Sequence, residues 1–129
     1  MAQNKERADN AEDMDFEIRF LEGVVEKSPD FIEALINLGD LYTKRGSFEK
    51  GLAVDLKLSS LRPGDPIILY NLACSYSLMN DPERSLEAIQ RAVQHGYRDV
   101  DFLSQDRDLA NLRKFPPFLD FLARIRAKV

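Results

Sequence analysis

The sequence has no tryptophan, and only one cysteine and one histidine occur among its 129 residues. Cys74 cannot form an internal disulfide, and without a second cysteine or a neighbouring base we expect it neither to bind a metal nor to act as a reactive thiol. Long hydrophobic runs are missing too, since no stretch approaches the about 20 apolar residues of a membrane helix. The polar N-terminus also lacks the apolar core of a secretory signal. These absences predict a cytoplasmic protein with no membrane association.

The motifs of common catalytic sites are also missing. The sequence contains no glycine-rich phosphate loop, no strand that could precede one, and no recognisable catalytic triad. Four aspartates near the C-terminal end resemble calcium ligands, but their register lacks the glycine and the glutamate that a calcium-binding loop needs. These aspartates are Asp99, Asp101, Asp106 and Asp108. We therefore expect no enzymatic activity, no metal and no cofactor.

The charge is weakly negative overall and unevenly distributed. The 18 basic and 22 acidic residues give a formal net charge of -4, which gives no support to binding of nucleic acid or of an acidic membrane. Residues 1–17 carry six acids against two bases, whereas residues 113–129 carry five bases against one acid. The two ends of the chain therefore have opposite charge.

Apolar residues recur at helical spacing in segments that proline and glycine separate. Asp65-Pro66 and Asp81-Pro82 each place a helix N-cap before a proline at the first helical position, and Asp30 with Glu33 resembles a capping box. The main helices are expected at about 14–27, 30–45, 47–61, 66–78 and 82–94, followed by shorter ones near 100–103 and 109–112 and a last one at 116–127. No segment alternates with the period of a strand. The sequence therefore predicts an all-α fold.

The sequence repeats itself with an offset of 34 residues. The matching pairs are Leu35 with Leu69, Leu38 with Leu72, Tyr42 with Tyr76, and Leu52 with Leu86. A period of 34 residues built from two helices is typical of tetratricopeptide repeats, and segments 35–42 and 69–76 resemble the first helix of that family. Gly39 and Ala73 supply the small residue that lets the two helices of a repeat approach closely.

This resemblance implies a right-handed superhelical stack of antiparallel helix pairs, an α-solenoid. A half repeat would occupy residues 14–29 and full repeats would occupy 30–63 and 64–97, after a polar segment at 1–13 that is either mobile or an extension of the first helix. Residues 98–129 resemble the terminal segment of many bacterial tetratricopeptide proteins. We expect them to form a helical cap on the stack.

The resemblance also implies that the chain binds a protein or a peptide in a concave groove. The groove residues would be Glu33, Ile36, Asn37, Asp40 and Lys44 from one repeat and Ile67, Tyr70, Asn71, Cys74 and Ser77 from the next. Asn37 and Asn71 match a position whose amide binds the peptide backbone in this family, although either could equally be a solvated polar residue. The basic residues that clamp a C-terminal carboxylate in some members are absent. An extended, apolar or mildly basic segment is the expected ligand.

The alternative interpretation is a scaffold protein that assembles with itself through the ends of the stack. Phe16 and Phe20 lie one helical turn apart and to one side of the apolar stripe of the first predicted helix. Their exposure predicts a homodimer contact, and the opposite charges of the two ends favour the same association. Against it, two exposed phenylalanines make a small patch that needs no partner.

Overall fold

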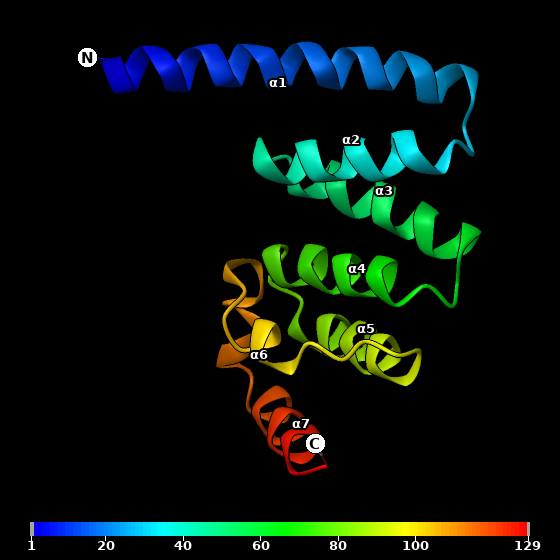
Figure 1. Ribbon diagram of the computed structural model, residues 1–129, viewed down its shortest axis with the longest axis vertical. Coiled ribbons are helices and arrows are strands. Elements are labelled where there is room, and N and C mark those ends of the chain that lie inside the picture. The colour runs from blue at the N-terminus through cyan, green and yellow to red at the C-terminus, as the bar shows by residue number, and fades with distance from the viewer. Residues whose placement is uncertain (1, 129) are drawn as a thin grey trace. The chain divides into compact units, whose positions relative to one another are not determined.

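The computed structural model describes the backbone of residues 2–128 and the side chains of residues 10–128. Within that range the chain forms seven α-helices and two short 3-10 helices, with no strand, so the predicted all-α class is confirmed (Figure 1). The elements are α1 (Ala2–Lys27), α2 (Ile32–Lys44), α3 (Phe48–Leu61), α4 (Pro66–Leu78), α5 (Pro82–Gln94), α6 (Val100–Leu103), η1 (Arg107–Leu109), η2 (Leu112–Lys114) and α7 (Pro116–Ala127). No helix within residues 2–128 combines the length and the apolar character needed to cross a bilayer.

The chain divides into two units, Met1–Leu58 and Ser59–Val129. In the first unit, α1 begins at Ala2, well before the apolar pattern that starts near Met14. Residues 2–13 contain neither proline nor glycine and several good helix formers, so nothing in them interrupts a helix. The first turns of α1 are therefore formed by polar residues that precede the apolar pattern.

Helix α2 packs against α1 through an apolar face and through polar contacts at its C-terminal end. Leu35 and Leu38 are buried on this face. The Tyr42 hydroxyl donates a hydrogen bond of 2.5 Å to Glu22, and the Arg45 guanidinium lies 2.7 Å from the carboxylate of Asp15. Burial, together with the Glu22 contact, raises the pKa of Tyr42 well above its usual value.

Helices α2 and α3 approach closely at two glycines, as the repeat pattern predicts for Gly39. A Cβ at Gly39 would lie 3.3 Å from Val54 and from Asp55, and one at Gly51 would lie 3.2 Å from Thr43. The absence of side chains at these two positions allows the close approach. A larger residue at Gly39 would force Val54 or Asp55 to move.

The start of α2 differs from the prediction. Its N-cap is Phe31, which has no side-chain capping bond, so the predicted capping box of Asp30 and Glu33 is wrong. Asp30 instead lies 3.5 Å from Lys57 in an exposed ion pair. The helix begins two residues after Asp30, because Pro29 opens a turn in which the amide of Phe31 donates to the carbonyl of Ser28.

In the second unit, α4 and α5 begin as predicted. The Asp65 carboxylate accepts hydrogen bonds from the backbone amides of Ile67 and Ile68 at 2.9 and 3.3 Å. The Asp81 carboxylate accepts one from the backbone amide of Arg84 at 3.2 Å. A proline follows each cap. The two helices pack together at small residues, where the buried Ser85 hydroxyl donates to the carbonyl of Ala73 at 2.7 Å.

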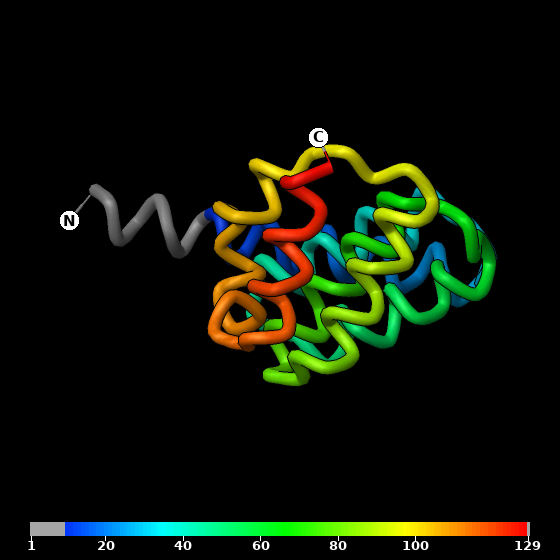
Figure 2. Tube along the Cα trace, turned by 90° about the horizontal axis from the view of Figure 1, so that it is seen from below, coloured from blue at the N-terminus to red at the C-terminus, as the bar shows by residue number. Residues whose placement is uncertain are grey.

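Residues 97–128 fold back onto these two helices. Helix η1 packs against α4, and η2 packs against α5. Figure 2 shows the end of the chain, coloured yellow to red, folded beside the green helices of this unit. The segment contributes large side chains with no exposed surface to the core of this unit: Leu103, Leu109, Leu112 and Phe118. It is therefore an integral part of the second unit.

Candidate functional site

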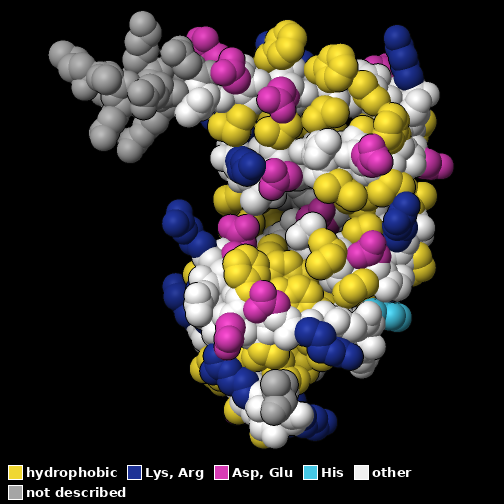
Figure 3. All heavy atoms as spheres, in the orientation of Figure 1, with side chains coloured by type: hydrophobic (Ala, Val, Ile, Leu, Met, Phe, Trp, Pro, Cys, Tyr) yellow, Lys and Arg dark blue, Asp and Glu magenta, His cyan; other side chains and the backbone are white. Residues whose placement is uncertain are grey.

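A surface hollow of about 580 Å³ lies between α1 and α2, within the first unit. Its lining combines residues of both helices: Met14, Glu17, Phe20, Leu21, Asn37, Asp40, Leu41 and Lys44. The space-filling view shows hydrophobic and acidic side chains next to one another over α1 (Figure 3). The hollow therefore offers apolar contact area beside negative charge.

The polar groups of the hollow come from both walls. Glu17 extends from α1, while Asn37 and Asp40 extend from α2, and all three are exposed. Asp40 pairs with Lys44 one turn later, at 2.9 Å. This hydrogen bond raises the pKa of Lys44 above its usual value, so the lysine stays charged. A carboxylate, an amide and an ion pair therefore surround the apolar floor.

The structure places the ten predicted groove residues in two groups, one in each unit. All five residues on α2 are exposed, and three of them, Asn37, Asp40 and Lys44, line the hollow. Glu33 and Ile36 are exposed on α2 outside its lining. Phe20, predicted as a self-association residue, borders the same hollow, whereas Phe16 does not.

Three predicted groove residues on α4 are buried instead of exposed. Tyr70, Cys74 and Ser77 expose 6%, 8% and 0% of their surface, so the prediction that they line an open groove is wrong. Ile67 and Asn71 remain exposed. The cause is the C-terminal segment, which covers this face of α4.

The covering contacts are specific. The ring of Tyr70 stacks on that of Tyr97, with centroids 4.7 Å apart, and its hydroxyl donates a hydrogen bond to Asp106. The Cys74 sulfur lies 3.8 Å from the same carboxylate. Burial above all raises the pKa of Tyr70 far beyond the ordinary tyrosine range, and Cys74 and Asp106 act in the same direction. The phenol therefore stays neutral under any physiological condition.

Ser77 is fixed by backbone and amide groups of the same segment. Its hydroxyl accepts a hydrogen bond of 3.2 Å from the amide of Leu112, and its carbonyl accepts one of 2.9 Å from Asn111. The Arg113 guanidinium donates to the carbonyl of Asp106 at 2.6 Å, which ties the segment to itself. These bonds satisfy polar groups that the covering would otherwise leave unpaired.

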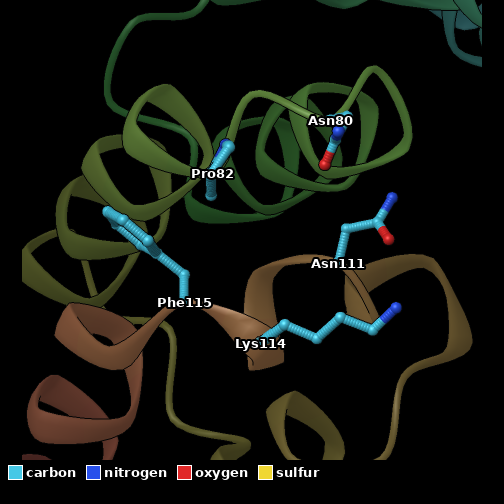
Figure 4. A pocket seen from close by; sticks show the side chains of 5 residues that line it. All are labelled: Asn80, Pro82, Asn111, Lys114 and Phe115. Carbon is cyan, nitrogen blue, oxygen red and sulfur yellow. The ribbon is translucent and has the colours of Figure 1, made fainter.

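A second hollow, of about 460 Å³, lies in the second unit between the turn after α4 and the region of η2. Its lining residues are Asn80, Pro82, Asn111, Lys114 and Phe115. Figure 4 shows the polar ends of the two asparagines and the lysine on one side, with Pro82 and Phe115 on the other. Nothing in the sequence predicted this hollow, because its residues come from segments about 30 positions apart that only the fold brings together.

No cluster of three or more histidine, cysteine, aspartate or glutamate side chains within residues 10–128 is arranged to hold a metal ion. The fold and these surfaces describe an all-helical protein with open, polar-edged hollows. The chain matches no protein family model. It is 31% identical over 80 residues to a chloroplastic protein of Arabidopsis thaliana, a match that covers 60% of this chain and 24% of that protein. The matched region is therefore about a quarter of the length of this relative.

Proposed function

We propose that the chain is a tetratricopeptide-like module whose first unit binds an extended segment of another protein in the hollow between α1 and α2. The observation that carries the proposal is the lining itself, in which exposed Phe20 and half-buried Met14 and Leu21 adjoin the amide of Asn37. Apolar area supplies affinity, and a few fixed polar groups orient the ligand. No catalytic step and no cofactor belong to this proposal.

The helix boundaries support the repeat interpretation. Helix α2 spans residues 32–44 and α4 spans 66–78, so both boundaries are displaced by 34 residues. The starts of α3 and α5, Phe48 and Pro82, are displaced by the same amount. Within the first unit, Asp15 pairs with Arg45 and Glu22 with Tyr42, an order expected of antiparallel neighbours. We propose on these grounds that the helices belong to a solenoid of antiparallel pairs, and the resemblance to tetratricopeptide repeats implies that it is right-handed.

The chemistry of the hollow favours an apolar and mildly basic ligand. The lining carries two carboxylates, Glu17 on α1 and Asp40 on α2, against one lysine, Lys44, so it keeps a net negative charge although Asp40 and Lys44 pair with each other. A lysine or arginine of the ligand would gain attraction there, whereas an acidic ligand would be repelled. An extended backbone leaves its amides and carbonyls free, and the Asn37 amide can both donate and accept. Binding of the ligand in the cytoplasm is part of the same proposal.

The experiment uses two synthetic peptides of equal length, one alternating leucine with lysine and the other alternating leucine with glutamate. Fluorescence anisotropy should show binding of the basic peptide at least about tenfold tighter than of the acidic one. Asn37→Ala and Asp40→Lys should each weaken the basic peptide, while Glu33→Lys, an exposed acid of α2 outside the lining, should have little effect. If Asp40→Lys and Glu33→Lys weaken binding equally, the peptide is held by non-specific charge attraction, and the hollow is rejected as the binding site.

A further inference from the structure

One face of α1 carries five exposed residues at the spacing of a coiled-coil seam. Asp13, Phe16, Phe20, Gly23 and Lys27 follow one another at intervals of three and four positions. The two phenylalanines expose 65% and 64% of their surface. Alternating steps of three and four keep side chains in one line along a helix, which is how paired helices present their contact residues.

The glycine in this line has no role in the packing of its own chain. A Cβ added at Gly23 would meet nothing within 4 Å, in contrast to Gly39 and Gly51, where neighbours lie at 3.3 and 3.2 Å. Glycine in a helix interior also weakens the helix relative to alanine. Its place between the exposed Phe20 and Lys27 would suit a second helix that comes close at this point.

We propose that a second copy of this chain docks on the seam, with the two α1 helices antiparallel about a two-fold axis beside Phe20. In this register Phe20 meets Phe20 of the second copy, and Phe16 packs over Gly23 of the second copy. Asp13 then lies opposite Lys27 of the second copy, and the two-fold axis repeats each contact. A contact of this kind is self-complementary, as two-fold interfaces require.

Charge selects the antiparallel arrangement over the parallel one. Parallel helices would place Asp13 against Asp13 and Lys27 against Lys27, whereas antiparallel helices convert both repulsions into attractions. Glu12 and Glu26 flank the seam, and in this register Glu12 would lie near Glu26 of the second copy, which opposes the pairing. Arg19 would lie near Arg19 of the second copy, which opposes the pairing. With a seam of only about 20 Å, the dimer is weak and depends on concentration.

The inference shares Phe20 with the proposed function, because Phe20 also borders the hollow between α1 and α2, but Asp13, Gly23 and Lys27 do not line that hollow, so substitutions at these three positions test the dimer separately. Sedimentation equilibrium of the full chain over roughly a hundredfold range of concentration should show a monomer that converts to a dimer. Gly23→Ala should weaken the dimer at least about tenfold while the melting temperature stays equal or rises. A dimer unchanged by Gly23→Ala, or a monomer at every concentration, would overturn the proposal.

A charge exchange tests the register. Asp13→Lys alone and Lys27→Asp alone should each lose the dimer, because like charges then face each other. An equimolar mixture of the two variants should associate, and the double variant should regain the wild-type behaviour. Circular dichroism of each variant verifies that α1 stays helical.

Leu119→Asp on α7 is the control for a change of surface charge outside the seam, since Leu119 is an exposed residue with 47% of its surface accessible. It should leave the dimer intact. If Leu119→Asp abolishes association, or if the mixture of charge variants stays monomeric, the contact is not the antiparallel α1 pair and the proposal fails.

Discussion

The ring of Tyr70 on α4 lies parallel to the ring of Tyr97, with 4.7 Å between centroids and 7° between planes. This stack joins the first helix of the second unit to the segment that follows α5. It also places the Tyr70 hydroxyl beside Asp106, so one side chain contacts two parts of the covering segment. Stacked aromatic pairs of this kind contribute about 0.5–1.5 kcal/mol beyond the area they bury.

Replacing Tyr70 with phenylalanine should destabilise the second unit by about 1–2 kcal/mol at neutral pH, because Asp106 loses the hydrogen bond from the hydroxyl. Urea unfolding followed by far-ultraviolet circular dichroism measures the change. Tyr76→Phe is a suitable control, since Tyr76 is a half-buried tyrosine of the same helix and its replacement leaves the ring stack and the hydrogen bond between Tyr70 and Asp106 in place. Equal losses for the two variants would contradict the role assigned to the Tyr70 hydroxyl.

The same tyrosine should make stability depend on alkaline pH. Its pKa is raised by burial, so the folded state keeps the phenol neutral while the unfolded state loses the proton above about pH 10. The stabilisation from Tyr70 is therefore fully present below about pH 10 and declines as the pH rises further. The stability difference between wild type and Tyr70→Phe should narrow above about pH 10. A constant difference up to about pH 12 would contradict this mechanism.

Ser77→Ala should cost about 1–3 kcal/mol, because the buried amide of Leu112 would lose its acceptor without gaining water. Asn71→Ala, an exposed residue on the same helix, is the matched control and should change stability by less than about 0.5 kcal/mol. Chemical denaturation of the two variants measures both effects. A loss from Ser77→Ala no larger than that of the control would show that the covering segment does not depend on this bond.

Two glycine substitutions should act in opposite directions. Gly39→Ala introduces a Cβ at 3.3 Å from Val54 and Asp55 and should lower stability by about 1–2 kcal/mol, since the close approach of α2 and α3 must loosen. Gly23→Ala meets no neighbour and should raise stability by up to about 1 kcal/mol through helix propensity. Thermal unfolding of both variants at low protein concentration tests the pair. Stabilisation by Gly39→Ala would mean that α2 and α3 do not need this close approach.

Asp15 should titrate below the ordinary range of an aspartate. The hydrogen bond from Arg45 lowers its pKa, and the positive charges of Arg45 and Arg19 act in the same direction. A carboxyl group whose pKa is lowered by folding stabilises the folded state at a pH above its pKa in the unfolded state, about 3.9. This stabilisation is lost as the pH falls through the pKa of the folded state. Carboxyl chemical shifts by NMR should show an upward shift of this pKa in Arg45→Gln. An unchanged value would contradict the ion pair.

Local patterns predicted the features that depend on neighbours in sequence. Asp65-Pro66 and Asp81-Pro82 specify where α4 and α5 begin, because the cap and the proline act within a few residues. The capping box at Asp30 failed although its residues are correct, since the turn after Pro29 delays the helix to Ile32. Short-range signals therefore predict that a helix is present more reliably than they predict the residue at which it begins.

The candidate site was predictable only in part, for a physical reason. Asn37, Asp40 and Lys44 lie on the exposed face of α2, which helical periodicity already indicates. The burial of Tyr70, Cys74 and Ser77 depends on where residues 97–113 fold, and no local pattern specifies a contact between positions 36 apart. The repeat pattern describes helices that face their neighbours, so it contains no information about a segment that covers one of them.

The covered face of α4 allows the opening of the C-terminal segment to be measured by chemical modification. Cys74 is the only thiol in the chain, and it lies next to Asp106 under the C-terminal segment. An alkylating reagent can modify Cys74 only in molecules whose C-terminal segment has detached from α4. With reagent in excess, the rate of labelling therefore equals the rate at which the segment opens. Labelling that stays slow in dilute urea and becomes fast only at global unfolding would mean that the segment never detaches alone. Labelling that is already fast in dilute urea would give the rate at which the segment opens without global unfolding.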